Sequence, residues 1–375
     1  MAVDPGARAT GAPPAAERIL DVRNFSVDYG WGEVAVRAVD AVDLHLERSR
    51  VLGIAGESGS GKSTLVYAIT RLLRAPGVIV GGEALLRVSD ATGADDVIDL
   101  VTANETQLRA VRWSQVSIVL QSALNALNPV LRVGALFDQV LKTHRREMSK
   151  GERHERAAEL LSLVGLGADR LARFPHELSG GQRQRVMIAL ALALDPALVI
   201  MDEPTTALDV VTQREILDEL LDLRQRFGFA MIFITHDLSL LVELADEIVV
   251  MYAGRLVERA GARELYDAPR HPYTLGLLNS FPPLHGKRSE LAGIVGSPPD
   301  FAALPSGCAF HPRCPYAFER CSRESPSLVE VASSGRFVAC WLHDSASGVA
   351  VPVELRRGSS TAAAPSRAET SGVSE

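Results

Sequence analysis

The chain has 375 residues, 47% of them hydrophobic, so it is long enough for two domains and for a substantial core. A formal net charge of −7 leaves no basic surface of the kind that contacts with phosphates require, so nucleic acid is not expected as a partner. The longest apolar run, residues 186–201, contains Asp195 and Pro196 and falls short of the roughly 18 to 20 apolar residues that span a membrane.

Both ends of the chain are poor in large apolar residues. Residues 1–17 and 344–375 are rich in alanine, serine, proline and glycine, and burial there cannot offset the entropy lost on folding. Two disordered tails are therefore predicted. Residues 1–17 also lack the basic start and the apolar stretch of a secretory signal, so a cytoplasmic protein is expected.

Short β-type runs alternate with helical runs between these tails. Strands are expected at 51–55, 198–201 and 229–235, and the helices that follow them at 63–73, 212–226 and 238–245. This alternation predicts an α/β fold with a parallel sheet over residues 18–260. Residues 104–193 are mostly helical in pattern, which indicates an inserted helical subdomain. Residues 261–343, rich in proline and glycine, are expected to form a separate, small C-terminal domain.

A glycine-rich loop follows the first expected strand. The residues GESGSGKS at 56–63 match G-x-x-x-x-G-K-[ST] between a strand and a helix, the context in which this pattern binds phosphate. Glycines let successive N–H groups point inward, and the helix adds its positive N-terminal end. Lys62 is expected to reach the β- and γ-phosphates and Ser63 to bind Mg²⁺. The predicted triphosphate-binding residues of this loop are Gly56, Glu57, Ser58, Gly59, Ser60, Gly61, Lys62, Ser63 and Thr64.

A second glycine-containing helix start lies further along the chain. Residues LSGGQ at 178–182 open a helix that is expected to run to about residue 194. The Ser179 hydroxyl and the glycine amides there can contact an anion without obstruction by side chains. A helix cap made of serine and glycine is the alternative interpretation.

Two adjacent carboxylates follow the apolar strand at 198–201. Ligands of open α/β sheets collect at the carboxyl ends of strands, so Asp202 and Glu203 are placed for catalysis. We expect Asp202 to hold the metal, directly or through water, and Glu203 to activate the attacking water as general base.

Taken together, the three motifs resemble those of the ATP-binding-cassette (ABC) family, over about residues 19–258. The resemblance implies a P-loop NTPase fold of the ABC nucleotide-binding type, with ATP and Mg²⁺ as ligands. It also implies a dimer in which the signature residues act in trans, on the ATP that the partner's P-loop holds. Those residues are Ser179, Gly180, Gly181 and Gln182.

The resemblance assigns further residues. Gln121 matches the glutamine that joins the catalytic core to the helical subdomain and senses Mg²⁺ or water, and Asp209 matches the loop at the dimer interface. His236 matches the switch histidine that contacts the γ-phosphate. An aromatic residue that stacks on adenine is expected before the P-loop, with Tyr29 as first choice and Trp31 as alternate.

One short segment departs from the family pattern. Ser49 and Arg50 stand where the family usually has Gly-Glu before the P-loop strand. This difference affects the turn that is expected before that strand. It affects none of the residues assigned to ATP binding or hydrolysis.

Segments after the catalytic motifs narrow the resemblance. Residues 202–210, 250–258 and 266–278 resemble the oligopeptide/dipeptide (and nickel) importer branch. The resemblance implies a peripheral ATPase on the cytoplasmic face of the membrane. Its partners would be a homologous ATPase subunit (a homo- or heterodimer), two transmembrane permease subunits and an extracytoplasmic substrate-binding protein.

Alternatives remain for the cargo and for the class. Nickel or short-saccharide import is the nearer rival to peptide import. An ABC ATPase of DNA repair, translation or cluster assembly would be expected to show a long coiled-coil insertion, a second cassette or a basic surface, and the sequence has no such feature.

All four cysteines lie in the C-terminal region, at Cys308, Cys314, Cys321 and Cys340. Their spacing lacks the C-x₂-C unit usual in structural zinc sites but supplies four thiolates suited to an iron–sulfur cluster. The resemblance implies one four-iron, four-sulfur cluster there, with zinc or unligated buried thiols as alternatives. Loss of one cysteine is expected to loosen this region and to leave the P-loop intact.

Overall fold

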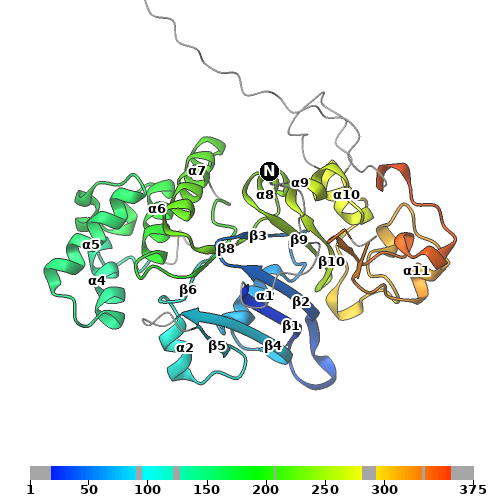
Figure 1. Cartoon of the computed structure of the whole chain (residues 1–375), viewed down its shortest axis with the longest axis horizontal. Helices are drawn as coiled ribbons and strands as arrows, with labels where there is room; N and C mark the ends of the chain where they lie inside the picture. Colours follow the sequence, from blue (N-terminus) through cyan, green and yellow to red (C-terminus); the bar gives the residue numbers. More distant parts are fainter. Residues whose placement is uncertain are drawn as a thin grey trace, which may run out of the picture.

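The computed structural model of the chain describes residues 18–89, 95–120, 127–206, 208–280, 293–331 and 334–355. Within these residues, the larger sheet has the strand order β11-β12-β10-β9-β3-β8-β7-β6 (Figure 1). Its strands are β3 Val51–Ala55, β6 Val116–Val119, β7 Leu198–Asp202, β8 Ala230–Ile234, β9 Glu247–Tyr252, β10 Arg255–Gly261, β11 Val329–Glu330 and β12 Phe337–Val338.

The centre of this sheet is parallel and fully buried. β6, β7, β8, β3 and β9 pair in parallel, and every residue of β3, β7 and β8 is buried. Such continuous apolar strands are typical of a sheet covered on both faces. The crossover helices α1 Lys62–Ile69, α7 Val210–Phe227 and α8 Leu238–Leu244 follow β3, β7 and β8, which confirms the expected alternation.

A second, antiparallel sheet packs beside α1. Its order is β2-β1-β4-β5, and α2 Glu105–Val111 follows it in the chain. Apolar residues of β1 and β2 share one core cluster with residues of β3 and α1, so the two sheets enclose the helix that carries the P-loop lysine. The strands are β1 Arg18–Tyr29, β2 Val36–Glu47, β4 Gly77–Ser89 and β5 Asp95–Asp99.

The helical region is shorter than predicted. It consists of α4 Val133–His144, α5 Lys150–Leu163 and α6 Gly180–Ala191, with 3-10 turns between α5 and α6. The expected start at residue 104 is wrong, because α2 follows the antiparallel sheet and β6 pairs with β7 of the larger sheet. A short apolar run such as that of β6 can be either a strand or part of a buried helix, so the sequence pattern does not separate the two. Gly165, at φ +69°, follows the end of α5, in the left-handed conformation that glycine commonly adopts after a helix.

The C-terminal region is joined to the larger sheet. It contains α9 Ala262–Asp267, α10 Pro272–Asn279 and α11 Glu319–Arg323, and β12 pairs with β10. Residues 344–355, which the composition assigns to a disordered tail, are packed instead: Leu355 is fully buried and its carbonyl accepts a hydrogen bond from Arg270. These residues are small or medium in size and follow no regular apolar pattern, so the sequence gives too weak a signal for this contact to be predicted.

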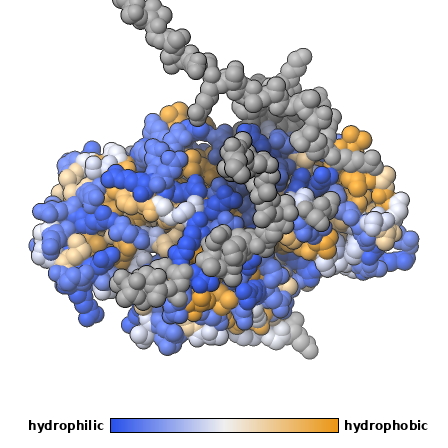
Figure 2. All heavy atoms as spheres, viewed as in Figure 1, coloured by the Kyte–Doolittle hydropathy of each residue, from blue (hydrophilic) through white to orange (hydrophobic). Residues whose placement is uncertain are grey.

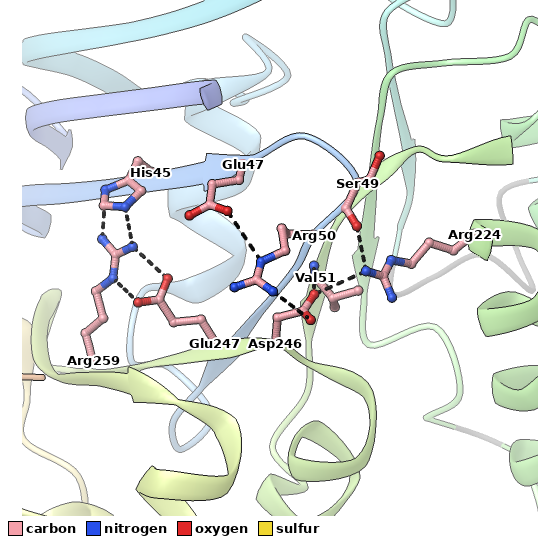
Figure 3. Close-up of polar contacts among 9 residues, drawn as sticks. All are labelled: His45, Glu47, Ser49, Arg50, Val51, Arg224, Asp246, Glu247 and Arg259. Carbon is pink, nitrogen blue, oxygen red and sulfur yellow. Dashed lines mark hydrogen bonds and ion pairs between the residues drawn. The ribbon is translucent and has the colours of Figure 1, made fainter. Parts of the chain in front are cut away.

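The departure at residues 49 and 50 is a turn held by a polar network (Figure 3). Ser49 has φ +57°, a conformation that costs a non-glycine residue energy, and its hydroxyl donates to the Gly228 carbonyl at 2.6 Å. Arg50 forms ion pairs with Glu47 and Asp246, each at 3.4 Å. The turn is therefore made without the Gly-Glu pair, and at the opposite end of β3 from the P-loop.

Among the described residues, no helix is long and apolar enough to cross a bilayer. The face seen in Figure 2 is mostly hydrophilic, with apolar residues in separate patches. Separate apolar patches are ordinary on a folded protein.

Candidate nucleotide site

The P-loop curls tightly between β3 and α1. Gly56 and Gly61 have φ of +149° and +103°, values that favour glycine. Close approach adds a second requirement, because a Cβ at Gly56 would lie 2.4 Å from the Met251 carbonyl oxygen and one at Gly61 would lie 2.6 Å from that of Ala38. These two glycines let the loop pass close to the backbone of two neighbouring segments.

Lys62 lies inside this loop. Its side chain is buried, and its Nζ donates to the carbonyls of Gly56 and Glu57, both at 2.8 Å, and to the Ser60 hydroxyl at 3.4 Å. Burial lowers the pKa of Lys62, and the carboxylates of Glu203, Asp202 and Glu57 oppose that shift. The loop thus surrounds one ammonium group, the arrangement that binding of a polyphosphate requires.

Asp202 meets the start of α1 at the end of β7. Its carboxylate is fully buried and accepts hydrogen bonds from the Ser63 hydroxyl at 3.0 Å and the Tyr67 hydroxyl at 2.7 Å. Burial raises the pKa of Asp202, whereas these two hydrogen bonds lower it. The structure brings Ser63 and Asp202 together as predicted, and two hard oxygen donors this close suit Mg²⁺ completed by phosphate oxygens and water.

Tyr67 is a residue of this site that the motifs do not reveal. It lies four residues after Ser63, so the two side chains share one face of α1. That spacing is the one signal in the sequence that points to it. Burial, followed by the hydrogen bond to Asp202, raises the pKa of Tyr67, so its hydroxyl stays a donor at neutral pH.

Glu203 and His236 follow neighbouring strands, β7 and β8. Glu203 has φ +45°, its N–H donates to the Ile234 carbonyl at 3.0 Å, and its carboxylate accepts from Thr206 at 3.0 Å. His236 Nδ1 lies 3.7 Å from Glu203 Oε1, and the imidazole is half exposed. A glutamate in a left-handed conformation is uncommon, and such residues cluster at functional sites.

Two adjoining clefts open beside the P-loop. The first, of about 390 Å³, is lined by residues 58–64, Tyr29, Glu203 and Phe301. The second, of about 460 Å³, shares Ser58 and Glu203 and adds Gly56, Glu57, His236 and Ile294. Of the two aromatic candidates, Tyr29 lines the first cleft, with its hydroxyl 3.4 Å from that of Thr64, whereas Trp31 is 67% exposed and lines neither. Phe301, from the C-terminal region, has no motif around it that predicts a place in this cleft.

The signature residues lie apart from both clefts. Ser179 is the N-cap of α6: it accepts from the Gln182 N–H at 3.3 Å, and the Gln182 side chain accepts from the Ser179 N–H at 3.2 Å. A Cβ at Gly181 would lie 2.7 Å from Thr212, whose N–H donates to Asp209 at 3.0 Å. Neither Gly180 nor the other three signature residues line either cleft. Gln121 lies outside the described residues.

The four cysteines surround one small cavity of about 20 Å³, which His271 and Phe310 also line. Burial, reinforced by the neighbouring thiols, raises the pKa of Cys314 to about 11 and that of Cys340 to about 12. In the described part of the chain, no group of three or more His, Cys, Asp or Glu side chains is arranged to hold a metal ion. The sequence prediction that these cysteines act together thus has spatial proximity in its favour, and their ligand remains a prediction.

Comparison with known proteins gives a consistent picture. Residues 39–206 match the model of the ABC transporter family, and residues 257–321 match that of the oligopeptide/dipeptide transporter C-terminal region. The oligopeptide transport ATP-binding protein OppD of Salmonella typhimurium is 41% identical over 89% of this chain and 96% of its own length. The dipeptide transport ATP-binding protein DppD of Caldanaerobacter subterraneus is 39% identical over 87% of this chain and 97% of its own length.

A solved structure agrees with the fold. The dimeric structure of the ATP-binding cassette MJ0796, in a post-hydrolysis state with ADP and Pi, aligns with a TM-score of 0.56 and 29% identity. The alignment covers 65% of this chain and 99% of the MJ0796 chain. These matches confirm the resemblance stated from the motifs. The chain belongs to the ABC transporter family, as one of its ATPases, and has the C-terminal region of the oligopeptide/dipeptide members.

Proposed function

We propose that this chain binds and hydrolyses MgATP to drive import of di- or oligopeptides, from the cytoplasmic face of a membrane. The observation that carries the proposal is the combination of a nucleotide cleft built from P-loop residues with a C-terminal region of the oligopeptide/dipeptide type. The relatives' names, as oligopeptide and dipeptide transport ATP-binding proteins, support the cargo class.

In this proposal the P-loop amides and Lys62 bind the phosphates, and Ser63 and Asp202 hold Mg²⁺. When bound there, Mg²⁺ would supply positive charge that offsets the negative charge of the phosphates during hydrolysis. Glu203 orients the attacking water and accepts its proton as general base, and His236, 3.7 Å away, contacts the γ-phosphate. Gln121 is assigned to sense Mg²⁺ or water. Tyr29 stacks on adenine.

The signature residues are proposed to complete the site of a partner ATPase. Ser179 caps the N-terminus of α6, and no signature residue lines either cleft of its own chain. In a dimer, a homologous ATPase subunit would contact Asp209 and the signature helix of this chain. The signature residues of this chain would then lie against the nucleotide held by that subunit. Closure of such a dimer on ATP would move two permease subunits, and an extracytoplasmic binding protein would deliver the peptide.

Reconstitution into liposomes tests the cargo. The full chain is assembled with candidate permease subunits and a candidate substrate-binding protein, and ATP-dependent uptake of a labelled tripeptide, Ni²⁺ and a disaccharide is compared. Uptake of the tripeptide alone, abolished by Glu203→Gln, is the expected result. Uptake of Ni²⁺ or the disaccharide would replace the cargo, and failure of all three to stimulate ATPase activity would contradict the importer role.

The cysteine cavity is proposed to hold one four-iron, four-sulfur cluster that stabilises the C-terminal region. Its support is that four thiols line one cavity, and four cysteine thiolates are the ligands of such clusters. Because the described side chains are not arranged to hold a metal ion, binding of a cluster would require them to rearrange. Anaerobically purified protein should contain about four iron and four sulfide per chain, and Cys321→Ser should lose both. One zinc per chain would replace the cluster by a structural ion, and protein with neither metal would leave buried thiols that act as small apolar residues.

A further inference from the structure

The P-loop residue Glu57 is held from the C-terminal region at two groups, its carboxylate and its backbone N–H. Its carboxylate faces Arg313, with Oε2 2.7 Å from Nη1 and Oε1 2.9 Å from Nη2. Its N–H donates to the Tyr273 hydroxyl at 2.7 Å. Its carbonyl accepts the hydrogen bond from Lys62 at 2.8 Å. One residue therefore connects the C-terminal region to the lysine that binds phosphate.

Arg313 is built to hold this position. Its side chain is 7% exposed, and its five N–H groups all have acceptors within 3.3 Å. Beyond Glu57, these acceptors are the carbonyls of Val295 and Gly296 and the Tyr252 hydroxyl. Hydrogen bonds to Glu57 raise the pKa of Arg313 further, against the effect of burial. A bidentate pair of this kind fixes direction as well as charge.

Tyr273 is equally restrained. It is fully buried in α10, and its ring lies 4.6 Å from that of Tyr252 and 5.3 Å from that of Phe310, centroid to centroid. Phe310 also lines the cysteine cavity. The hydroxyl that meets the P-loop thus stands on a packed aromatic cluster that joins β9, α10 and the cysteine-containing segment.

We propose that Arg313 and Tyr273 are positioning residues for ATP: by fixing Glu57, they fix the loop whose carbonyls orient Lys62, so the C-terminal region sets nucleotide affinity. Without them, the Glu57 carboxylate would have no buried partner among these contacts, and the loop would sample conformations in which Lys62 is turned away from the phosphates. Binding would then require that the loop be reordered, which lowers affinity. This inference rests on the assignment of the P-loop as nucleotide site and is independent of the cargo.

The test is a double-mutant cycle on the full chain, read by equilibrium binding of the Mg²⁺ complex of an imido analogue of ATP. Arg313→Ala and Glu57→Ala should each weaken binding about tenfold, and the double variant should be no weaker than either, because both remove the same pair. Tyr273→Phe, which keeps the packed ring, should weaken binding by a smaller factor. KM for ATP should rise in all of them more than kcat falls.

Two controls separate the possible outcomes. Arg320→Ala removes a cation of the same region that pairs with Glu324 and Asp344, away from the P-loop, and should leave binding unchanged. Lys62→Ala should abolish binding, and if it does not, the nucleotide site itself is misassigned. If Lys62→Ala abolishes binding while Arg313→Ala and Tyr273→Phe change only the melting temperature, the positioning role is overturned. Effects of Arg313→Ala and Glu57→Ala that multiply in the double variant overturn it as well.

Discussion

At the scale of single residues, the nucleotide site separates groups that bind from groups that react. Lys62 is enclosed by the loop and contacts its carbonyls, whereas Glu203 lines both clefts and lies 3.7 Å from His236. Contacts made to bound ATP and contacts made only in the transition state should therefore be lost by different substitutions.

Lys62→Ala is expected to abolish ATP binding, because it removes the charge at the centre of the loop. Glu203→Gln is expected to keep binding and to reduce turnover by about 10²- to 10⁴-fold, the usual contribution of a general base. Nucleotide binding and steady-state ATPase assays measure the two effects. Near-normal turnover of Glu203→Gln would remove Glu203 from its role.

Tyr67→Phe should shift the pH dependence of hydrolysis. The Tyr67 hydroxyl lowers the pKa of Asp202, which burial raises, so its loss raises that pKa further. Asp202 must be ionised to hold Mg²⁺. On acidification, the variant should therefore lose activity at a higher pH than the unsubstituted protein does, and it should need a higher Mg²⁺ concentration. A kcat/KM profile at saturating and limiting Mg²⁺ measures this. An acid limb that coincides with that of the unmodified protein would show that Tyr67 does not tune the carboxylate.

At the scale of elements, helix starts are used twice for different purposes. α1 follows the P-loop, which lines its own cleft, whereas the first residues of α6, which is capped by Ser179, line neither cleft, and Gly181 lies against Thr212 at the start of α7. This separation is consistent with the proposal that the signature residues complete the site of a second chain, which stays a prediction.

Mixed dimers test this arrangement. A dimer with Lys62→Ala in one chain and Ser179→Arg in the other should retain one complete site, because both lesions fall on the same composite site. The same two changes within one chain should damage both sites. Trapped nucleotides per dimer are counted, and the reverse ranking of the two dimers would mean that each chain completes its own site.

At the scale of the whole molecule, the two sheets are tied together by a histidine (Figure 3). His45 of β2 contacts Arg259 of β10 through both ring nitrogens, at 3.1 and 2.8 Å, and Arg259 pairs with Glu247 at 2.6 Å. Burial, followed by the charge of Arg259, lowers the pKa of His45 to about 4, against the opposing effect of Glu247.

This contact predicts acid sensitivity. Because the pKa of His45 is lower in the folded protein than its usual value of about 6.5, its contribution to stability is present above pH ~6.5 and is lost as the pH falls towards 4. His45→Gln should reduce the loss of unfolding free energy over that range, and the exposed His154→Gln should not. Part of the loss of unfolding free energy on acidification should persist in His45→Gln, because burial also lowers the pKa of His271 and His343. Urea titrations from pH 7.5 to about 4.5 measure it, and parallel curves for all three proteins would contradict the assignment.

The residues that could be predicted from the sequence are those whose chemistry depends on neighbours along the chain. The loop at 56–64 and the pair Asp202 and Glu203 need a fixed local spacing, so their motifs are visible, as is the alternation that builds the sheet. Phe301 and Arg313 reach the P-loop from the far end of the chain, and no spacing relates them to it. These contacts therefore do not support the expectation that the C-terminal region is separate from the P-loop.

The pairing of β12 with β10 has a practical consequence for how this protein can be divided. β12 hydrogen-bonds along Glu258 and Arg259, so it covers a strand edge whose residues are buried in the full chain. A fragment that stops near residue 260 would present that edge to solvent, and open edges of this kind recruit strands from other molecules. Aggregation of such a fragment would say nothing about the stability of the ATPase core, so assays of the core belong on the full chain.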